Sequence, residues 1–224
     1  MGEMIRFPKA GGEGDTSGYL AMASNPKGAV VVLQEWWGLN EQIKATCDRF
    51  ADEGFTALAP DLYQGRVTQD PDEASHMMNG LDWGGAAHED ARGAVKYLKG
   101  ETGEKTAIMG FCMGGALTVI GAVHIPEVDA AVCYYGIPPK DVADPSKIGV
   151  PFQGHFATED DWCTPEAVNA LKEATAGLET PVEIHSYEGK QHGFFNGTVA
   201  AYDEEAAEES WTRTIEFLST HLKD

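Results

Sequence analysis

The sequence predicts an α/β domain with a mostly parallel, twisted sheet of about eight strands and helices on both faces. The first observation is that short runs rich in β-branched residues alternate with helical stretches along the chain. The second is that several of these runs are apolar at every position, which is typical of strands covered on both faces. The third is that no repeat or low-complexity linker divides the 224 residues, so residues 1–224 are expected to form one domain.

Each predicted strand is a short apolar or β-branched run that ends at a turn signal. Residues 29–33 (AVVVL) show no polar alternation and are expected to be fully buried. The first two segments predict a short antiparallel hairpin. The predicted strands cover residues 4–7, 16–23, 29–33, 55–59, 106–111, 130–135, 151–157 and 182–187.

Capping and stop signals predict helices between these strands. Asn40 is expected to cap a helix that stops at Gly54, and Thr164 is expected to cap a helix that starts at Pro165. Further helices are predicted directly after residue 111, at 86–100 and near 202–221. In contrast, Pro71, Gly80, Gly84 and Gly85 predict a loop-rich region before residue 86.

Composition argues against several classes of function. The 36 acidic and 16 basic residues give a formal charge of −20, which disfavours binding to nucleic acid and to anionic membrane surfaces. No apolar run reaches the roughly 18 residues of a membrane span, and the N-terminus lacks the pattern of a secretory signal. The cysteines, at positions 47, 112, 133 and 163, show neither paired spacing nor histidines at ligand spacing. We therefore expect a cytoplasmic protein with no disulfide framework and no metal site.

The segment GFCMGG, residues 110–115, directly follows a predicted buried strand and opens a helix. This is the G-x-C-x-G pattern of a nucleophile elbow, in which a strained residue on a sharp strand-to-helix turn presents its side chain to substrate. The glycines leave room for the close backbone approach that this turn requires. The context predicts an α/β-hydrolase fold with Cys112 as the nucleophile, although a lone free cysteine is usually only a small buried side chain.

In α/β-hydrolases the acid and the histidine follow the nucleophile in that order. After Cys112, an acidic cluster at residues 159–161 closes one predicted strand, and His192 lies on a glycine-flanked loop after the next. Both positions lie at the carboxyl ends of strands, where the active sites of parallel sheets are found. His192 is therefore the candidate base, and either Asp160 or Asp161 is its candidate partner.

Glu35, in the segment QEWWG, follows the first fully apolar strand. These folds place an N–H group of the oxyanion hole in this region. A partly desolvated carboxyl group there would have a raised pKa and could exchange a proton with a thiol. The alternative is an ordinary surface glutamate.

Taken together, these segments resemble the dienelactone hydrolases, also called carboxymethylenebutenolidases. The resemblance covers essentially the whole chain and rests on residues 34–40 (QEWWGLN), 59–63 (APDLY), 110–115 (GFCMGG) and 192–194 (HGF). It implies a cofactor-free Cys-His-Asp triad in which Glu35 holds the resting thiol and takes its proton when substrate arrives. It also implies an oxyanion hole formed by the backbone N–H groups of Trp36 and Met113.

The resemblance also bears on the choice of acid. The acid of this family lies four residues before a proline that starts the next helix, and counting back from Pro165 leads to Asp161. One inserted residue in this loop would shift the role to Asp160.

One departure from the family concerns the substrate. Well-known dienelactone hydrolases clamp the substrate carboxylate with arginines, but Asn196 occupies one of those positions and no arginine lies between Arg66 and Arg92. A neutral ester, lactone or thioester is thus at least as plausible a substrate as dienelactone. Residues expected to line the substrate pocket are Trp36, Trp37, Trp83, Phe195 and Asn196.

The sequence therefore predicts hydrolysis of a small ester or lactone through an acyl-cysteine intermediate, by a monomer or weak homodimer. One alternative is a thiol acyltransferase, which would transfer the acyl group to an acceptor other than water. The other is a binding protein that kept the hydrolase scaffold without turnover.

Overall fold

The computed structural model describes residues 1–11 and 13–223, which build one eight-stranded sheet in the order β1-β2-β4-β3-β5-β6-β7-β8. β1 pairs with β2 and β2 with β4 in antiparallel fashion, and all other neighbours are parallel. The strands are β1 (Glu3–Pro8), β2 (Asp15–Ala21), β3 (Ala29–Leu33), β4 (Thr56–Pro60), β5 (Thr106–Phe111), β6 (Ala130–Tyr134), β7 (Phe152–Glu159) and β8 (Val182–Gln191). The predicted α/β-hydrolase architecture is confirmed.

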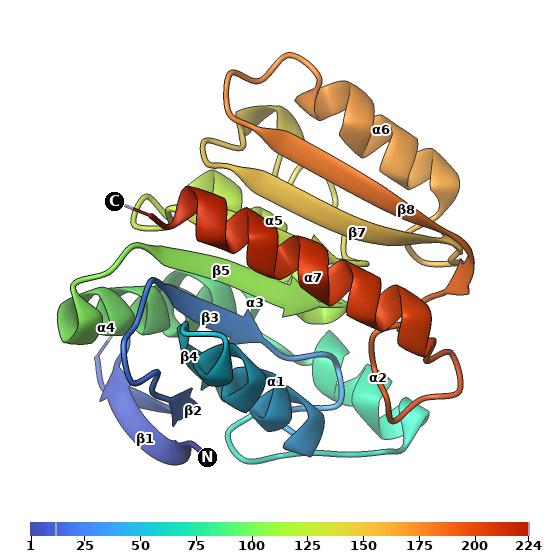
Figure 1. Ribbon diagram of the computed structural model, residues 1–224. Helices are drawn as coiled ribbons and strands as arrows, with labels where there is room; N and C mark the ends of the chain where they lie inside the picture. Colours follow the sequence, from blue (N-terminus) through green and yellow to red (C-terminus); the bar gives the residue numbers. More distant parts are fainter. Residues whose placement is uncertain (12, 224) are drawn as a thin grey trace.

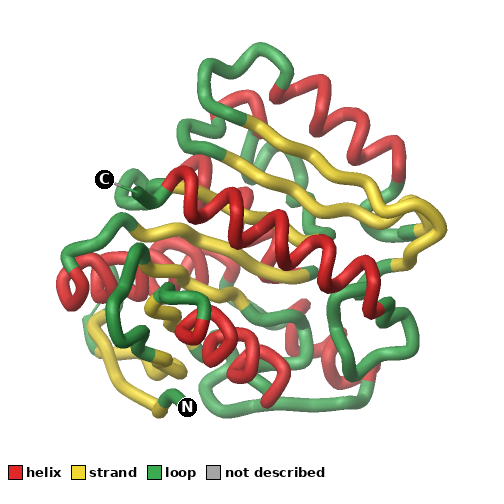
Figure 2. Tube along the Cα trace, in the orientation of Figure 1, coloured by secondary structure: helices red, strands yellow, loops and turns green. Residues whose placement is uncertain are grey.

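Helices cover both faces of the sheet (Figures 1 and 2). On one face, α1 (Glu41–Asp52) and α7 (Glu204–His221) bury side chains such as Phe50 and Trp211 against the strands. On the other face lie α4 (Arg92–Thr102), α5 (Met113–His124) and α6 (Pro165–Thr175). Because the middle strands are covered on both sides, every residue of β3, β4, β5 and β6 is buried.

The region predicted to be loop-rich contains a helix, α2 (Pro71–Asn79), so that part of the prediction was wrong. Asp70 caps it, because its side chain accepts hydrogen bonds from the backbone N–H groups of Asp72 and Glu73 at 2.9 and 3.1 Å. Pro71 occupies the first turn, where its missing N–H costs nothing, and Gly80 ends the helix. The short helix α3 (Trp83–Gly85) and a π-helical stretch, Ala86–Ala91, then lead into α4.

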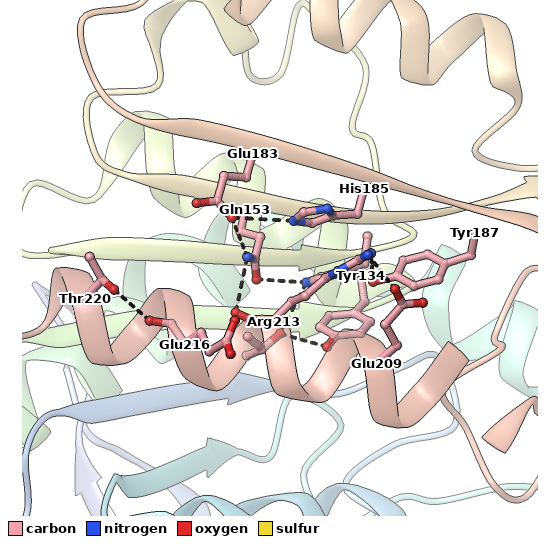
Figure 3. A network of polar contacts seen from close by, with 11 residues as sticks. Tyr134, Gln153, Glu183, His185, Tyr187, Glu209, Arg213, Glu216 and Thr220 are labelled. Carbon is pink, nitrogen blue, oxygen red and sulfur yellow. Dashed lines mark hydrogen bonds and ion pairs between the residues drawn. The ribbon is translucent and has the colours of Figure 1, made fainter. Parts of the chain in front are cut away.

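A polar network with a buried centre at His155 fastens α7 to β7 and β8 (Figure 3). Arg213 donates to the hydroxyl of Tyr187 at 3.2 Å, which leaves the single phenolic proton for His155 Nδ1 at 2.8 Å. His155 Nε2 then donates to Gln153 at 2.9 Å, and the Gln153 amide donates to Glu183 at 2.8 Å. From Arg213 to Glu183, each group donates to the next one. His155 therefore accepts at Nδ1 and donates at Nε2, which fits its neutral Nε2–H form. Burial accordingly lowers the pKa of His155 well below its usual value, and the nearby His185 and Arg213 add to the effect.

The topology brings four segments that are distant in sequence to one edge of the sheet. Glu35 lies just beyond β3, Cys112 directly follows β5, Asp160 directly follows β7 and His192 directly follows β8. These strands run in the same direction, so their carboxyl ends meet at that edge.

Candidate active site

A cavity of about 390 Å³ opens at the carboxyl ends of the parallel strands. Apart from a few polar groups, its walls are aromatic or aliphatic, as is usual for small-molecule sites. It is lined by Glu35, Trp36, Trp37, Met78, Cys112, Trp162, His192, Gly193, Asn196, Val199 and Ala201.

Cys112 has the backbone geometry of a nucleophile elbow. Its φ angle of 55° lies in the left-handed region, which non-glycine residues seldom adopt. Two contacts show why glycines flank it: a side chain on Gly110 would meet the Gly114 carbonyl oxygen at 2.3 Å, and one on Gly114 would meet the Leu33 carbonyl oxygen at 2.3 Å. The turn is also tied to β6, because the Cys112 N–H donates to the Tyr134 carbonyl at 3.0 Å.

The sulfur of Cys112 is buried among groups that favour the neutral thiol. Burial raises its pKa far above the usual range, and the nearby Glu35 carboxylate raises it further. The backbone N–H groups of Met113 and Trp36 act on the thiol in the opposite direction and lower its pKa without cancelling the shift. Both predicted oxyanion-hole groups therefore converge on the candidate nucleophile.

His192 is held by Asp160. The distance from His192 Nδ1 to Asp160 Oδ2 is 2.8 Å, and the other carboxylate oxygen of Asp160 accepts from the backbone N–H groups of Trp162 and Cys163 at 2.8 and 2.9 Å. Burial by itself would raise the pKa of Asp160, but the contact with His192 and the backbone N–H donors outweigh it and the pKa is lowered. Because Nδ1 is engaged by Asp160, Nε2 is the nitrogen available to the cavity.

Asp161, the acid that the resemblance favoured, is exposed, so this choice was wrong and Asp160 is the partner of His192. The turn that follows β7 directs the side chain of Asp160 inward and leaves the next residue facing solvent. Asp160 also lies one residue further from Pro165 than the four-residue spacing that the prediction used.

A β-bulge sets the position of His192. The pairing of β7 with β8 is regular up to Ala157 and Tyr187 and resumes at Glu159 and Gln191, so β8 carries additional residues in between. Gly189 lies in this bulge with a φ of 68°, and its N–H donates to the hydroxyl of Thr158 at 2.8 Å. The bulge bends the end of β8, and His192 is delivered above Asp160.

Glu35 is buried, with only 5% of its surface exposed, and its carboxylate is held by two neutral donors. The hydroxyl of Tyr135 donates to Oε1 at 3.1 Å, and the side-chain amide of Asn196 donates to Oε2. Burial raises the pKa of Glu35, while Asn196, His192 and Tyr135 partly offset the shift. The interpretation as a surface glutamate is thereby excluded.

Asn196 lines the cavity as predicted, but its amide is already committed to protein groups. Its nitrogen donates to Glu35, while its oxygen accepts from the N–H of Thr198 at 2.9 Å and from the Thr198 hydroxyl at 2.6 Å. The amide thus links Glu35 to the loop between β8 and α7.

Two of the predicted pocket residues lie elsewhere. Trp83, on α3, packs against the hydrophobic core on the sheet face that α4 and α5 cover, and it does not line the cavity. Phe195 is buried, because its ring stacks on Phe111 with centroids 4.9 Å apart. Trp36 and Trp37 do line the cavity and contact each other edge-on at 5.0 Å.

Sequence reasoning missed other residues of the site. Met78 comes from the unpredicted helix α2, and Trp162 follows the acidic cluster directly. Tyr135, which holds Glu35, has a φ of 37°, and its ring packs edge-on against that of His192 at 4.9 Å. Of these, Trp162 alone carried a sequence signal, because it adjoins the candidate acid.

Within residues 1–11 and 13–223, no group of His, Cys, Asp and Glu side chains has the arrangement of a metal site. In the same residues, no helix combines the length and the apolar character that a membrane crossing requires.

Comparison with known proteins places this geometry in a family. A family model described as the dienelactone hydrolase family matches residues 16–222. The chain belongs to this family. A protein of Aquifex aeolicus named "Putative carboxymethylenebutenolidase" is 33% identical over 233 residues, which cover all of both chains. "Protein usf" of Aquifex pyrophilus is 32% identical over 232 residues, covering 99% of this chain and 100% of the relative.

A solved structure from Klebsiella pneumoniae, named as a "Putative Dienelactone Hydrolase", superposes with a TM-score of 0.81 at 25% identity and covers 98% of this chain and 99% of its own. The dienelactone hydrolase-like chain is therefore an ester or lactone hydrolase with an α/β-hydrolase fold.

Proposed function

We propose that the protein hydrolyses a small neutral ester or lactone through an acyl-cysteine intermediate formed on Cys112. The observation that carries the proposal is the meeting, at one cavity, of an elbow cysteine and a histidine whose Nδ1 lies 2.8 Å from a buried aspartate. Nucleophile, base and orienting acid in this arrangement are the parts of nucleophilic acyl transfer.

In the proposed acylation step, Cys112 Sγ attacks the carbonyl carbon and Glu35 takes the thiol proton. The N–H groups of Trp36 and Met113, which converge on the sulfur, would then stabilise the oxyanion of the tetrahedral intermediate. When the C–O bond breaks, the proton passes from Glu35 by way of His192 Nε2 to the leaving oxygen, so a neutral alcohol and a thioester result and Glu35 is again a carboxylate. The raised pKa of Glu35 supports this role, because a buried carboxylate that resists ionisation is a better proton acceptor than an exposed one.

In the proposed deacylation step, His192 Nε2 takes a proton from a water molecule, which attacks the thioester. The C–S bond breaks, the sulfur recovers its proton, and the carboxylic acid is released. Asp160 orients the imidazole and stabilises it while it is charged, which requires that Asp160 itself stay ionised. Its lowered pKa meets this requirement.

The charges around the cavity favour a neutral substrate. Among the described residues that line it, none is Lys or Arg, and Glu35 contributes a carboxyl group. The basic side chains that might have approached are paired with acids: Lys190 with Asp203 at 2.6 Å and Arg66 with Glu73 at 3.6 Å. A substrate carboxylate would therefore enter the cavity without a cationic partner, which is costly.

We also keep the expectation of a cytoplasmic monomer or weak homodimer. The free thiols of the described chain, including Cys112, are compatible with a reducing compartment. Sedimentation at several concentrations would test the oligomeric state.

The experiment that tests the proposed function is a screen of small neutral esters and lactones before and after alkylation of Cys112, with mass spectrometry to locate the modified residue. Activity should be lost in proportion to modification of Cys112. Activity that survives complete modification of Cys112 would overturn the proposal. Product analysis with added alcohols separates hydrolysis from acyl transfer, because a transferase would form a new ester.

A further inference from the structure

Trp162 is an exposed aromatic residue with a fixed backbone. With 45% of its surface exposed it is the most exposed of the tryptophans, and within the described residues it joins neither hydrophobic core cluster. Its backbone N–H donates to Asp160 at 2.8 Å, so the main chain is anchored although the ring is not. Single exposed hydrophobic residues are common on protein surfaces, but this ring also lines the cavity, which points to a role in binding.

The ring of Trp162 stands beside the candidate base. Its centroid lies 5.2 Å from that of the His192 ring, at an interplanar angle of 70°, and Trp162 lines the cavity. The ring thus borders the part of the cavity that adjoins His192.

That space has a defined use in the proposed reaction, on which the present inference rests. Deacylation is the reverse of acylation with water in place of the alcohol. The water activated by His192 therefore attacks from the position that the leaving alcohol has vacated. A side chain that borders His192 consequently borders the leaving group rather than the acyl group.

We propose that Trp162 is a specificity-determining residue for the leaving group and selects esters of flat, aromatic alcohols. The indole offers an apolar face to a phenol or enol ring, and aromatic pairs gain more than the burial of their area alone. Met78, Val199 and Ala201 add further apolar surface to the cavity, and neither Lys nor Arg is among the described residues that line it. The favoured substrate class is an uncharged aryl or enol ester.

The test uses two esters with the same acyl group, phenyl acetate and cyclohexyl acetate, on the wild-type protein and on Trp162→Ala and Trp162→Phe. The intrinsic reactivity of each ester cancels when its kcat/KM is compared between wild type and variant. Trp162→Ala should lower kcat/KM for phenyl acetate by roughly three- to tenfold and for cyclohexyl acetate by less than about twofold. Trp162→Phe should recover most of the loss. Tyr202→Ala removes an aromatic ring that is 41% exposed and lies outside the cavity, and serves as the matched control.

The deacylation rate separates recognition of the leaving group from a structural effect. Both esters give the same acetyl-enzyme, so its hydrolysis should be unchanged in Trp162→Ala. An equal loss for both esters, or slower deacylation, would mean that Trp162 only supports His192 and Asp160, and would overturn the proposal. Unchanged kinetics with both esters would overturn it as well.

A binding measurement keeps this inference distinguishable from the proposed function. Phenol should bind to Cys112→Ala, measured by calorimetry, and should bind several-fold more weakly when Trp162→Ala is added. If Cys112→Ala still hydrolyses esters, the proposed function fails while the phenol measurement still tests Trp162. If phenol binds equally to both variants, the inference about Trp162 fails alone.

Discussion

His192 Nδ1 lies 2.8 Å from Asp160 Oδ2, while the adjacent Asp161 is turned to solvent. The Asp160 carboxylate is fully engaged, because its second oxygen accepts the backbone N–H groups of the turn that follows. Asp160 therefore fixes both the imidazole and the shape of its own loop.

Asp160→Asn should lower kcat by roughly two to four orders of magnitude, because an amide in this position favours the wrong imidazole tautomer. Asp161→Asn changes the same functional group one position away, on an exposed residue, and should stay within about twofold of wild type. Steady-state kinetics of both variants with one chromogenic ester makes the comparison. Equal losses in the two variants would contradict the assignment.

Cys112→Ala should abolish ester hydrolysis and leave the thermal unfolding midpoint nearly unchanged. The strained elbow serves chemistry rather than packing, and alanine tolerates this backbone no worse than cysteine. Cys47→Ala is the control, since Cys47 is buried in the core between α1 and the sheet and should affect stability more than activity. A Cys112→Ala variant that loses only a few-fold in rate would rule out the nucleophile assignment.

Glu35→Gln should slow acylation much more than deacylation. The amide keeps the shape of the side chain but cannot accept the thiol proton, whereas His192 still serves the second step. Pre-steady-state kinetics with a chromogenic ester resolves the two phases. If acylation proceeds at the wild-type rate, Glu35 is not the proton acceptor.

The same substitution should also change the pH dependence of stability. Burial raises the pKa of Glu35 in the folded protein, so as pH rises above its unfolded value of about 4.3 the unfolded chain loses this proton more readily than the folded one. The free energy of unfolding of the wild-type protein therefore falls as pH rises. Glu35→Gln removes this contribution, because the amide does not titrate. The variant should unfold at a higher temperature than wild type at pH 7, and this difference should shrink towards pH 4. Calorimetry across this range tests the sign, and a difference that does not depend on pH would contradict the raised pKa.

Dienelactone should be a poorer substrate than a neutral ester of similar size. Its carboxylate would meet a cavity whose described lining includes no Lys or Arg and where the Asn196 amide is occupied by Glu35 and Thr198. The loss of one charge-assisted hydrogen bond, about 1.5–3 kcal/mol, corresponds to roughly tenfold or more in kcat/KM. The ratio of kcat/KM for dienelactone to that for the neutral ester tests this prediction. Equal values would mean that a cation reaches the dienelactone carboxylate when the substrate is bound.

The strands and the elbow could be predicted because they depend on local patterns. Runs such as residues 29–33 are apolar throughout. The glycines around Cys112 indicate a tight turn in which residues with a side chain would collide with the backbone. The helix α2 was missed because Pro71 and Gly80 were interpreted as loop signals, although they mark its first turn and its end.

The details of the site depend on contacts that no local pattern records. The hydrogen bond between Asn196 and Glu35 joins residues 161 positions apart in the sequence. The choice between Asp160 and Asp161 depends on the direction of a turn, and the places of Trp83 and Phe195 depend on which face of the sheet their rings meet. Aromatic residues are common in cores and in pockets alike, so their composition alone could not assign them.

The order in which the strand ends contribute to the cavity has a consequence for biosynthesis. Glu35, Cys112 and Asp160 precede His192 in the chain, and the loop that carries Asn196 comes later still. A nascent chain that has emerged only as far as β7 carries the thiol but not the imidazole. Its Glu35 also lacks the Asn196 amide that holds it in the finished protein. In the proposed mechanism, hydrolysis therefore needs β8 docked on β7 and the loop that carries Asn196, so we expect the unfinished chain to lack hydrolase activity.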